Sequence, residues 1–276
     1  MMQALQLLAA PTAMCLILAG MHCYLGIHVL RRGVIFIDLS LAQVAAFGYT
    51  LALSLGGPWA WGKGYFLALV CTWAAGALFA LARHRKVAFS QEALIGVVYA
   101  LGAAAVVLLA DRMPHGAEAA HDLMVGQVLW VTWGDVLETG AIYAVVGLLH
   151  YLFRGPLLRL SAGEPVAHAG RWDFLFYALF GVVISSSVRV AGVLQVFSYL
   201  IVPALLGGLF FETVRSRLIF GWLLGTALTL LALAASYTLD LPTGAAIVVL
   251  FAALPVLAVL GWPWLKRYAR VGLRSH

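Results

Sequence analysis

Charged residues are scarce in this 276-residue chain: 10% are charged, 64% are hydrophobic, and the mean hydropathy is +1.00. A soluble domain is roughly one quarter charged and about half apolar. The composition therefore excludes an ordinary soluble domain and predicts an all-α, polytopic transmembrane helical bundle. No polar stretch is long enough for a second domain, so we expect one membrane domain over residues 1–276. The net charge of +6 then concerns membrane orientation and does not indicate a nucleic-acid partner.

Common catalytic motifs are also missing. The chain has no HExxH, GxSxG or paired CxxC, and its three cysteines lie singly within apolar runs. The stretch GPWAWGK at 57–63 fits a P-loop pattern, but Gly64 stands where a Ser or Thr would hold magnesium, and the loop joins two apolar segments. These observations argue against an ATPase site in this chain and leave no compact nucleophile–base pair for an intramembrane enzyme.

Long apolar runs dominate what is present. Each is near the ~20 residues that a helix needs to cross a membrane. We count nine, with the split at Arg189 and the segment 137–153 the weakest: 8–30, 34–56, 64–82, 93–110, 137–153, 174–189, 192–211, 217–238 and 244–262.

Basic residues orient these segments, because cytoplasmic loops of membrane proteins are enriched in Lys and Arg. With the Arg31–Arg32 loop in the cytoplasm, the nine-span order leaves only Lys63, Arg112 and Arg189 of the 17 basic residues outside. The pattern predicts an N-terminus outside and a C-terminus in the cytoplasm.

Two connecting stretches differ from the spans. Residues 111–136 form an outer loop rich in His, Asp and Glu, which is either a solvated loop or a place that collects a metal or docks a protein. Residues 154–173 form the longest cytoplasmic loop, and its GEPVAHAG sequence favours a short helix. Such a helix suits docking of a cytoplasmic partner, although an ordinary connecting loop is the alternative.

Three motifs carry a resemblance to a known family: YTLDLPTGAAIVVL at 237–250, VAGVLQVFSYLIVPALL at 190–206, and GIHVLRRGVIFIDLSLAQVAAFG at 26–48. Together they resemble the permease subunit of metal-ion (zinc, manganese, iron) ATP-binding-cassette importers, the ABC-3 family. The resemblance covers nearly the whole chain and allows eight spans as well as nine.

The resemblance implies a bacterial inner-membrane permease that hydrolyses no ATP itself. A second permease copy, cytoplasmic ABC ATPase subunits, an extracytoplasmic metal-binding protein and membrane lipid are the implied partners. It implies no permanently bound cofactor: the divalent metal is cargo, and ATP is bound by the partner subunit. In the family, an acidic residue, an alanine and a glycine of a cytoplasmic helix couple to the ATPase, and Glu164, Ala167 and Gly170 stand at those positions. The stretch FFETVRSR at 210–217 is a second candidate contact.

The second span departs from the family pattern F-x-G-D-A-x-x-H, whose Asp and His share one helix face. When Gly48 is aligned, Gln43 takes the histidine position, while Asp38 lies one residue early and is rotated by about 100°. We expect Ser40 and Gln43 to line the transport pathway, with an interhelical hydrogen bond as the alternative. Asp38 is a pathway residue or forms a salt bridge or water contact near the cytoplasmic face.

The first span offers other ligands in MHCYLGIH. Imidazole suits zinc and related ions, so His22 and His28 are candidate pathway residues, and His22 is the candidate metal contact. His22 and Gln43 should reach similar depth if their helices are antiparallel neighbours. A simple hydrogen bond within the bundle is the alternative for each histidine.

The D-L-P-T-G motif lies at the outer mouth in this topology. Thr243 can cap the last helix, and the motif is then a structural turn. The alternative is that the Asp240 carboxylate attracts a cation at the mouth. The resemblance implies an importer of a divalent transition metal, zinc first and manganese or iron next, that works by alternating access. Import of a metal chelate or another small solute, or an intramembrane enzyme, remains the alternative.

Overall fold

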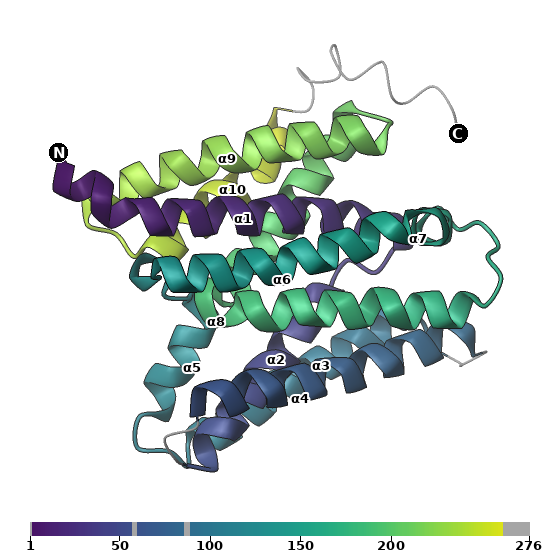
Figure 1. The fold of residues 1–276 in the computed structure, drawn as a ribbon, viewed down its shortest axis with the longest axis horizontal. Helices are drawn as coiled ribbons and strands as arrows, with labels where there is room; N and C mark the ends of the chain where they lie inside the picture. Colours follow the sequence, from purple (N-terminus) through teal and green to yellow (C-terminus); the bar gives the residue numbers. More distant parts are fainter. Residues whose placement is uncertain (1, 57–59, 86–88, 262–276) are drawn as a thin grey trace.

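The computed structural model describes residues 2–56, 60–85 and 89–261, and these form a helical bundle elongated along its helices (Figure 1). Within these ranges, eight helices are long and apolar enough to cross a membrane, and the polytopic helical bundle that the composition predicts is confirmed. The elements are α1 (Met2–Arg32), α2 (Ile37–Ser54), α3 (Ala60–His84), α4 (Gln91–Ala110), α5 (Gly116–Val125), the 3-10 turn η1 (Val128–Trp130), α6 (Trp133–Leu152), α7 (Arg154–Ser161), α8 (Ala169–Phe210), α9 (Val214–Leu239) and α10 (Thr243–Leu260).

Helix starts follow local capping chemistry where the sequence supplies it. The Ser90 side chain accepts a hydrogen bond from the backbone N–H of Ala93 and caps α4. Thr132 and Asp135 form a reciprocal capping box at the start of α6. These caps fix the points at which α4 and α6 begin, at opposite ends of the bundle.

Helix α8 joins two predicted segments, 174–189 and 192–211, within 42 residues. The helix continues through Arg189 and is interrupted at Gly192, whose φ of 72° lies in the left-handed region that favours glycine. The two halves run in opposite directions relative to α1. The first half contacts Arg32 near its start and His22 near its end, so it runs antiparallel to α1. The second half contacts Cys15 first and Gly26 later, so it runs in the same direction as α1. The predicted boundary at Arg189 was thus three residues early, and the nine segments lie on eight helices.

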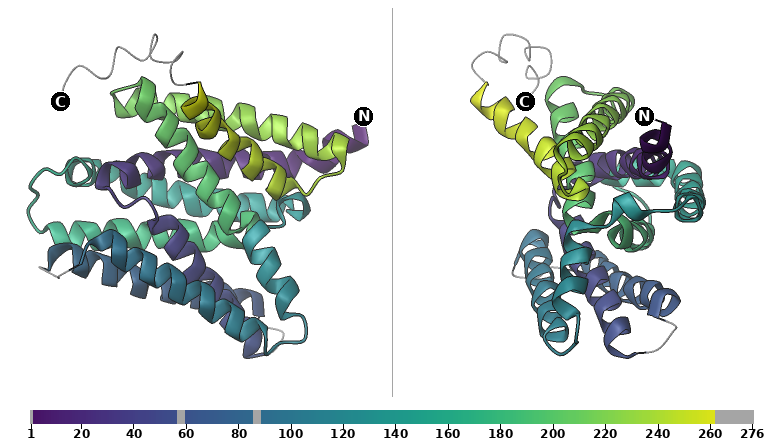
Figure 2. Two further views of the ribbon diagram at one scale, coloured as in Figure 1. Left: turned by 180° about the vertical axis from the view of Figure 1, so that it is seen from behind. Right: turned by 90° about the vertical axis from the view of Figure 1, so that its left-hand side faces the viewer.

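The halves of α8 join two groups of helices (Figure 2). α2, α3 and α4 pack together on one side, and α9 and α10 pack on the other, with α1, α6 and α8 between them. Buried apolar side chains form a continuous core through these helices. The outer faces of α4 and α10 expose valine and leucine, which suits helices that contact lipid.

One end of the bundle carries most of the arginines, and we call it the arginine-rich end. α1 and α3 end there, and α9 begins there. The short helix expected over GEPVAHAG was wrong, because residues 162–168 are not helical and the short helix is α7, over 154–161. Pro165 disfavours helical geometry in the residue before it, and His168 has a left-handed φ of 55°.

Candidate functional site

His22 is the most deeply placed of the predicted pathway residues. Its side chain is fully buried, with Nδ1 2.7 Å from the carbonyl oxygen of Leu18 and Nε2 3.3 Å from the hydroxyl of Ser187. A carbonyl oxygen can only accept, so Nδ1 carries the proton of the neutral ring. The lone pair of Nε2, the atom available to a metal, therefore faces Ser187 on α8.

Other polar side chains continue from His22 towards the end of the bundle opposite the arginine-rich end. The Tyr143 ring lies 6.0 Å from the His22 ring, and its hydroxyl lies among the hydroxyls of Ser186 and Ser187 without hydrogen-bond geometry to either. Thr139, one turn before Tyr143 on α6, is also buried. We call His22, Ser187, Tyr143, Ser186 and Thr139 the polar column.

The polar column leads to a cavity of about 210 Å³. The cavity is lined by Gly62, Tyr65, Glu138, Thr139, Ile142, Ser186 and Arg189. Arg189 Nη2 lies 3.5 Å from Asp135 and 3.8 Å from Glu138, and both carboxylates stand at the start of α6. A chain of hydroxyls therefore connects a polar cavity with a buried imidazole, an arrangement that can pass a partly dehydrated cation or a proton.

Gln43 faces a different part of the bundle. Its side-chain amide lies 3.2 Å from the sulfur of Met124 on α5, and Gly102 on α4 leaves just enough room for the Gln43 backbone. α2 packs against α3, α4 and α8, whereas α1 packs mainly against α8, α9 and α6. The similar depth expected of His22 and Gln43 depended on α1 and α2 being neighbours, and these two helices do not pack closely against each other. Each residue still lies in a polar contact within the bundle.

Asp38 and Ser40 are almost fully buried near the start of α2. Among the residues that the structure describes, neither carboxylate oxygen of Asp38 nor the hydroxyl of Ser40 has a hydrogen-bond partner. Of the alternatives for Asp38, the salt bridge is not formed among the described residues, and Arg32 pairs with Asp173 instead. Asp38 lies in the first helical turn, where the helix dipole favours a negative charge.

Asp173 joins three helices at the arginine-rich end. Its fully buried carboxylate accepts from Arg32 of α1 and lies 2.7 Å from His84 Nε2 and 3.4 Å from Arg83 of α3. The Arg32 guanidinium also lies 3.9 Å above the Phe176 ring. Sequence reasoning missed this residue because Asp173 immediately precedes the apolar segment and was assigned to the loop.

His28 belongs to the same cluster and not to the polar column. Its Nδ1 lies 2.8 Å from the Ser161 hydroxyl, which also accepts from Arg32 Nε. The Ser161 hydroxyl donates to the carbonyl oxygen of Leu157 within α7. The contact between His28 and Ser161 therefore anchors the short helix α7 against α1.

The predicted coupling residues lie on the surface beside this cluster. Glu164 and Ala167 are exposed in the loop between α7 and α8, and Gly170 is exposed in the first turn of α8. Arg159 Nε donates to Glu164 at 3.0 Å, and its Nη2 donates to the Pro165 carbonyl, so the loop has a defined shape. Asp173 follows Gly170 by three residues, which ties the loop directly to α1 and α3.

The Asp240–Thr243 motif forms a turn between α9 and α10. Asp240 has a left-handed φ of 51° and ends α9, while the Thr243 hydroxyl lies 2.7 Å from that of Ser236. The predicted cap was wrong: Pro242 occupies the N-cap position, and Thr243 is the first helical residue. A side chain at Gly244 would collide with the carbonyl of Val125, so this glycine lets α10 start against α5.

No group of three or more His, Cys, Asp or Glu side chains that could hold a metal is found among the described residues. Beyond the predicted residues, the structure adds the hydroxyl-bearing members of the polar column and Met124: Thr139, Tyr143, Ser186, Ser187 and Met124. They escaped notice because hydroxyl and thioether side chains do not stand out in an apolar run.

Comparisons with known proteins identify the family of this chain. The model of the ABC 3 transport family matches residues 4–261. The "Manganese transport system membrane protein MntB" of Synechocystis sp. is 26% identical over 90% of this chain and 79% of its own length. The "Probable iron transport system membrane protein" of Haemophilus influenzae is 22% identical over 88% and 86%. The solved structure of PsaBC from Streptococcus pneumoniae in complex with Fab has a chain with the same fold, with a TM-score of 0.75, 19% identity and 93% of both chains covered. Because the family model covers nearly all of the sequence, the chain belongs to the ABC 3 transport family of membrane permeases.

Proposed function

We propose that this chain is the membrane-spanning subunit of an ABC importer that moves a divalent transition metal by alternating access. The observation that carries the proposal is the polar column, because it places His22 at the end of a hydroxyl-lined route within a bundle of this family. Buried polar groups in a membrane bundle are costly and commonly mark an ion pathway. Ser40, Gln43 and Asp38 are a second set of candidate contacts, on α2.

ATP hydrolysis would come from cytoplasmic ABC ATPase subunits that dock on the loop at residues 162–168. Glu164, Ala167 and Gly170 are exposed there, and Asp173 connects the loop to α1 and α3. A rigid connection of this kind can convert movement at the loop into movement of whole helices.

The orientation of the chain in the membrane is inferred from the distribution of its arginines. We propose that the arginine-rich end faces the cytoplasm of a bacterium, with the N-terminus outside and the C-terminus inside the inner membrane. An extracytoplasmic metal-binding protein would deliver cargo at the opposite end, near Asp240 and the Arg189 cavity. A second permease copy would complete the transporter, and no permanent cofactor is needed.

The cargo we propose is zinc, manganese or ferrous iron as a small cation. One named relative is described as a manganese transport system membrane protein and the other as a probable iron transport system membrane protein. Imidazole at His22 also suits zinc. A volume of about 210 Å³ equals roughly seven water molecules at ~30 Å³ each. That space suits a hydrated ion better than a bulky chelate, which is the second candidate cargo.

Uptake by the reconstituted complex tests these assignments. The permease, its ATPase and its binding protein would be placed in liposomes, and ATP-dependent accumulation of zinc, manganese, ferrous iron and cobalt would be measured. We expect one of these ions to accumulate, and we expect His22→Ala to abolish its uptake. His150→Ala is the matched control, because His150 is equally buried but lies outside the polar column.

Each outcome separates the alternatives. If His22→Ala transports normally while Gln43→Leu does not, the pathway follows α2, and the assignment of the column is wrong. If ATP hydrolysis responds to the permease but no free ion moves, the cargo is a chelate or another solute. If no ATPase copurifies with the permease, the importer assignment falls and an intramembrane enzyme becomes the better explanation.

A further inference from the structure

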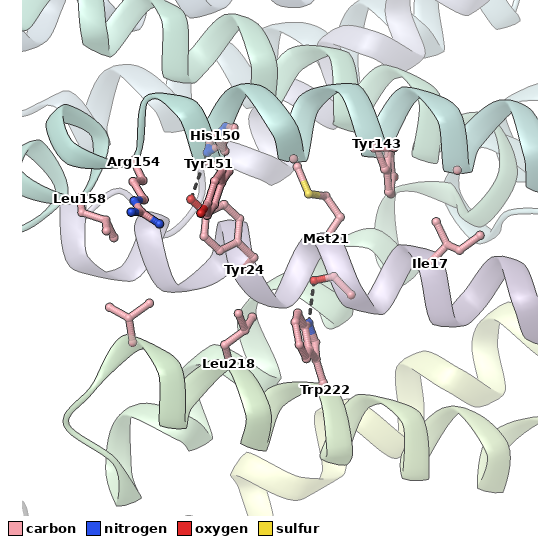
Figure 3. A pocket seen from close by; sticks show the side chains of 15 residues that line it. Ile17, Met21, Tyr24, Tyr143, His150, Tyr151, Arg154, Leu158, Leu218 and Trp222 are labelled. Carbon is pink, nitrogen blue, oxygen red and sulfur yellow. Dashed lines mark hydrogen bonds between the residues drawn. The ribbon is translucent and has the colours of Figure 1, made fainter.

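We propose that a groove between α1, α6 and α9 binds one acyl chain of an anionic phospholipid, whose phosphate is held by Arg154. The groove has a volume of about 630 Å³. Figure 3 shows it running from Ile17 at one end to Arg154 and Leu158 at the other. Most lining atoms are apolar, and all three helices are among those able to cross a membrane. The proposal concerns a lipid site and stands apart from the transported cargo.

Missing side chains create the groove. A Cβ at Gly20 or Gly147 would meet no atom within 4 Å, and one at Gly140 would meet only the Ile17 methyl group, at 3.7 Å. From Gly140 to its last residue, Leu152, α6 rises about 18 Å at ~1.5 Å per residue, and Arg154 follows directly. One leaflet of the hydrocarbon core is about 15 Å thick, half of ~30 Å, so an extended acyl chain fits the length of the groove.

Polar groups gather at the arginine-rich end of the groove. Arg154 lies 4.6 Å from the centre of the Tyr151 ring, and Tyr24 lies 3.3 Å from Nδ1 of His150. Figure 3 shows these four side chains together at that end. His150 is 1% exposed, and its Nε2 has no partner among the described residues. That nitrogen has almost no accessible surface, and the ring packs against His28 and Phe176 inside the bundle, so Arg154 is the polar side chain that a headgroup at this end would meet.

The charge at this end selects an anionic headgroup. Arg154 takes part in none of the ion pairs found within the described ranges. The walls beside it also carry arginine, since α1 ends in Arg31 and α9 begins with Arg215 in its first turn. Basic pockets between membrane helices bind anionic lipid headgroups. The phosphate would meet Arg154, with the acyl chain along the glycines.

A second copy of this chain is a poorer occupant. In a two-fold dimer the same surface meets itself, so arginines at the mouth would face the partner's arginines. Like charges brought together near a membrane surface repel, whereas a lipid phosphate neutralises them. The cationic mouth thus favours lipid over self-association in this groove.

Native mass spectrometry of the purified permease tests the site. The protein would be titrated with phosphatidylglycerol and with phosphatidylcholine of identical acyl chains, and bound lipid per chain would be counted. We expect one tightly retained phosphatidylglycerol and weaker retention of phosphatidylcholine. Arg154→Gln should weaken phosphatidylglycerol binding about fivefold and phosphatidylcholine binding less, because the choline cation already opposes binding at a cationic mouth. Arg85→Gln, also exposed at this end, is the matched control.

Filling the groove gives an independent check. Gly147→Leu and Gly20→Leu, placed on different walls, should each lower retention of both lipids, because the side chain occupies the acyl site. Gly96→Leu is the control, since Gly96 lies on α4 with equally open space. Equal retention of the two lipids by the wild type would overturn the proposal. So would unchanged lipid binding in both filled variants, and loss of a dimer in those variants would assign the groove to a second copy.

Discussion

Replacing Asp173 with asparagine should destabilise the protein strongly, because it removes the negative charge from a buried cluster of cations. The carboxylate and the Arg32 side chain are both fully buried, and His84 and Arg83 contact the same carboxylate. Breaking a buried ion pair by removing one partner costs about 3–5 kcal/mol, because the remaining charge is desolvated without compensation. We therefore expect the midpoint of thermal unfolding to fall by about 10 °C, at ~2–4 °C per kcal/mol for a chain of this size.

Thermal unfolding of the detergent-purified permease, followed by circular dichroism, measures this effect. Glu164→Gln is the control: it breaks the exposed pair with Arg159, and such surface pairs contribute at most about 1 kcal/mol. The double variant Arg32→Leu/Asp173→Leu should recover part of the loss, because it removes both buried charges. Equal midpoints for Asp173→Asn and Glu164→Gln would refute the reasoning that this cluster is a buried electrostatic junction.

Three further changes test other features. Gly26→Ala should lower stability by about 1–3 kcal/mol, because the added methyl would overlap the Leu200 carbonyl of α8, and Gly96→Ala is the neutral control in the same unfolding assay. Gly192→Ala should cost at least ~1 kcal/mol, because its left-handed φ is unfavourable for alanine; an unchanged unfolding midpoint would contradict that account of the turn. Ala167→Arg should reduce permease-dependent ATP hydrolysis severalfold without changing the unfolding midpoint, and normal hydrolysis would place ATPase docking elsewhere.

Most of the fold was predictable because membrane helices are specified by long apolar runs and their charged ends. The short helix expected over GEPVAHAG and the boundary within α8 were exceptions. Arg189 looked like the end of a span, yet ion pairs with Asp135 and Glu138 on α6 let it stay within a helix. The helix is interrupted at Gly192 instead, because this residue adopts a left-handed φ. A hydropathy pattern carries no information on backbone conformation, so it could not locate the break.

The candidate site was harder to predict than the fold. Asp38 and Gln43 were found by composition and motif alignment, but their surroundings depend on which helices pack together. Gln43 meets Met124 because α5 folds back against α2, a contact that no local pattern encodes. His22 was recognised as a rare polar residue in an apolar span, whereas its partner Ser187 is too small and neutral to be noticed in sequence.

The fold-back of α8 also bears on how the chain enters the membrane during synthesis. Arg171 stands in the first turn of this helix, and Arg215 and Arg217 follow its end. Positive charges resist translocation, so both ends are retained on the same side while the apolar segment between them inserts. The chain reverses its direction at Gly192, so the two halves of α8 can insert into the membrane together as one helical hairpin. A single straight insertion of this segment would invert α9 and α10, and the arginines at its two ends act against that error.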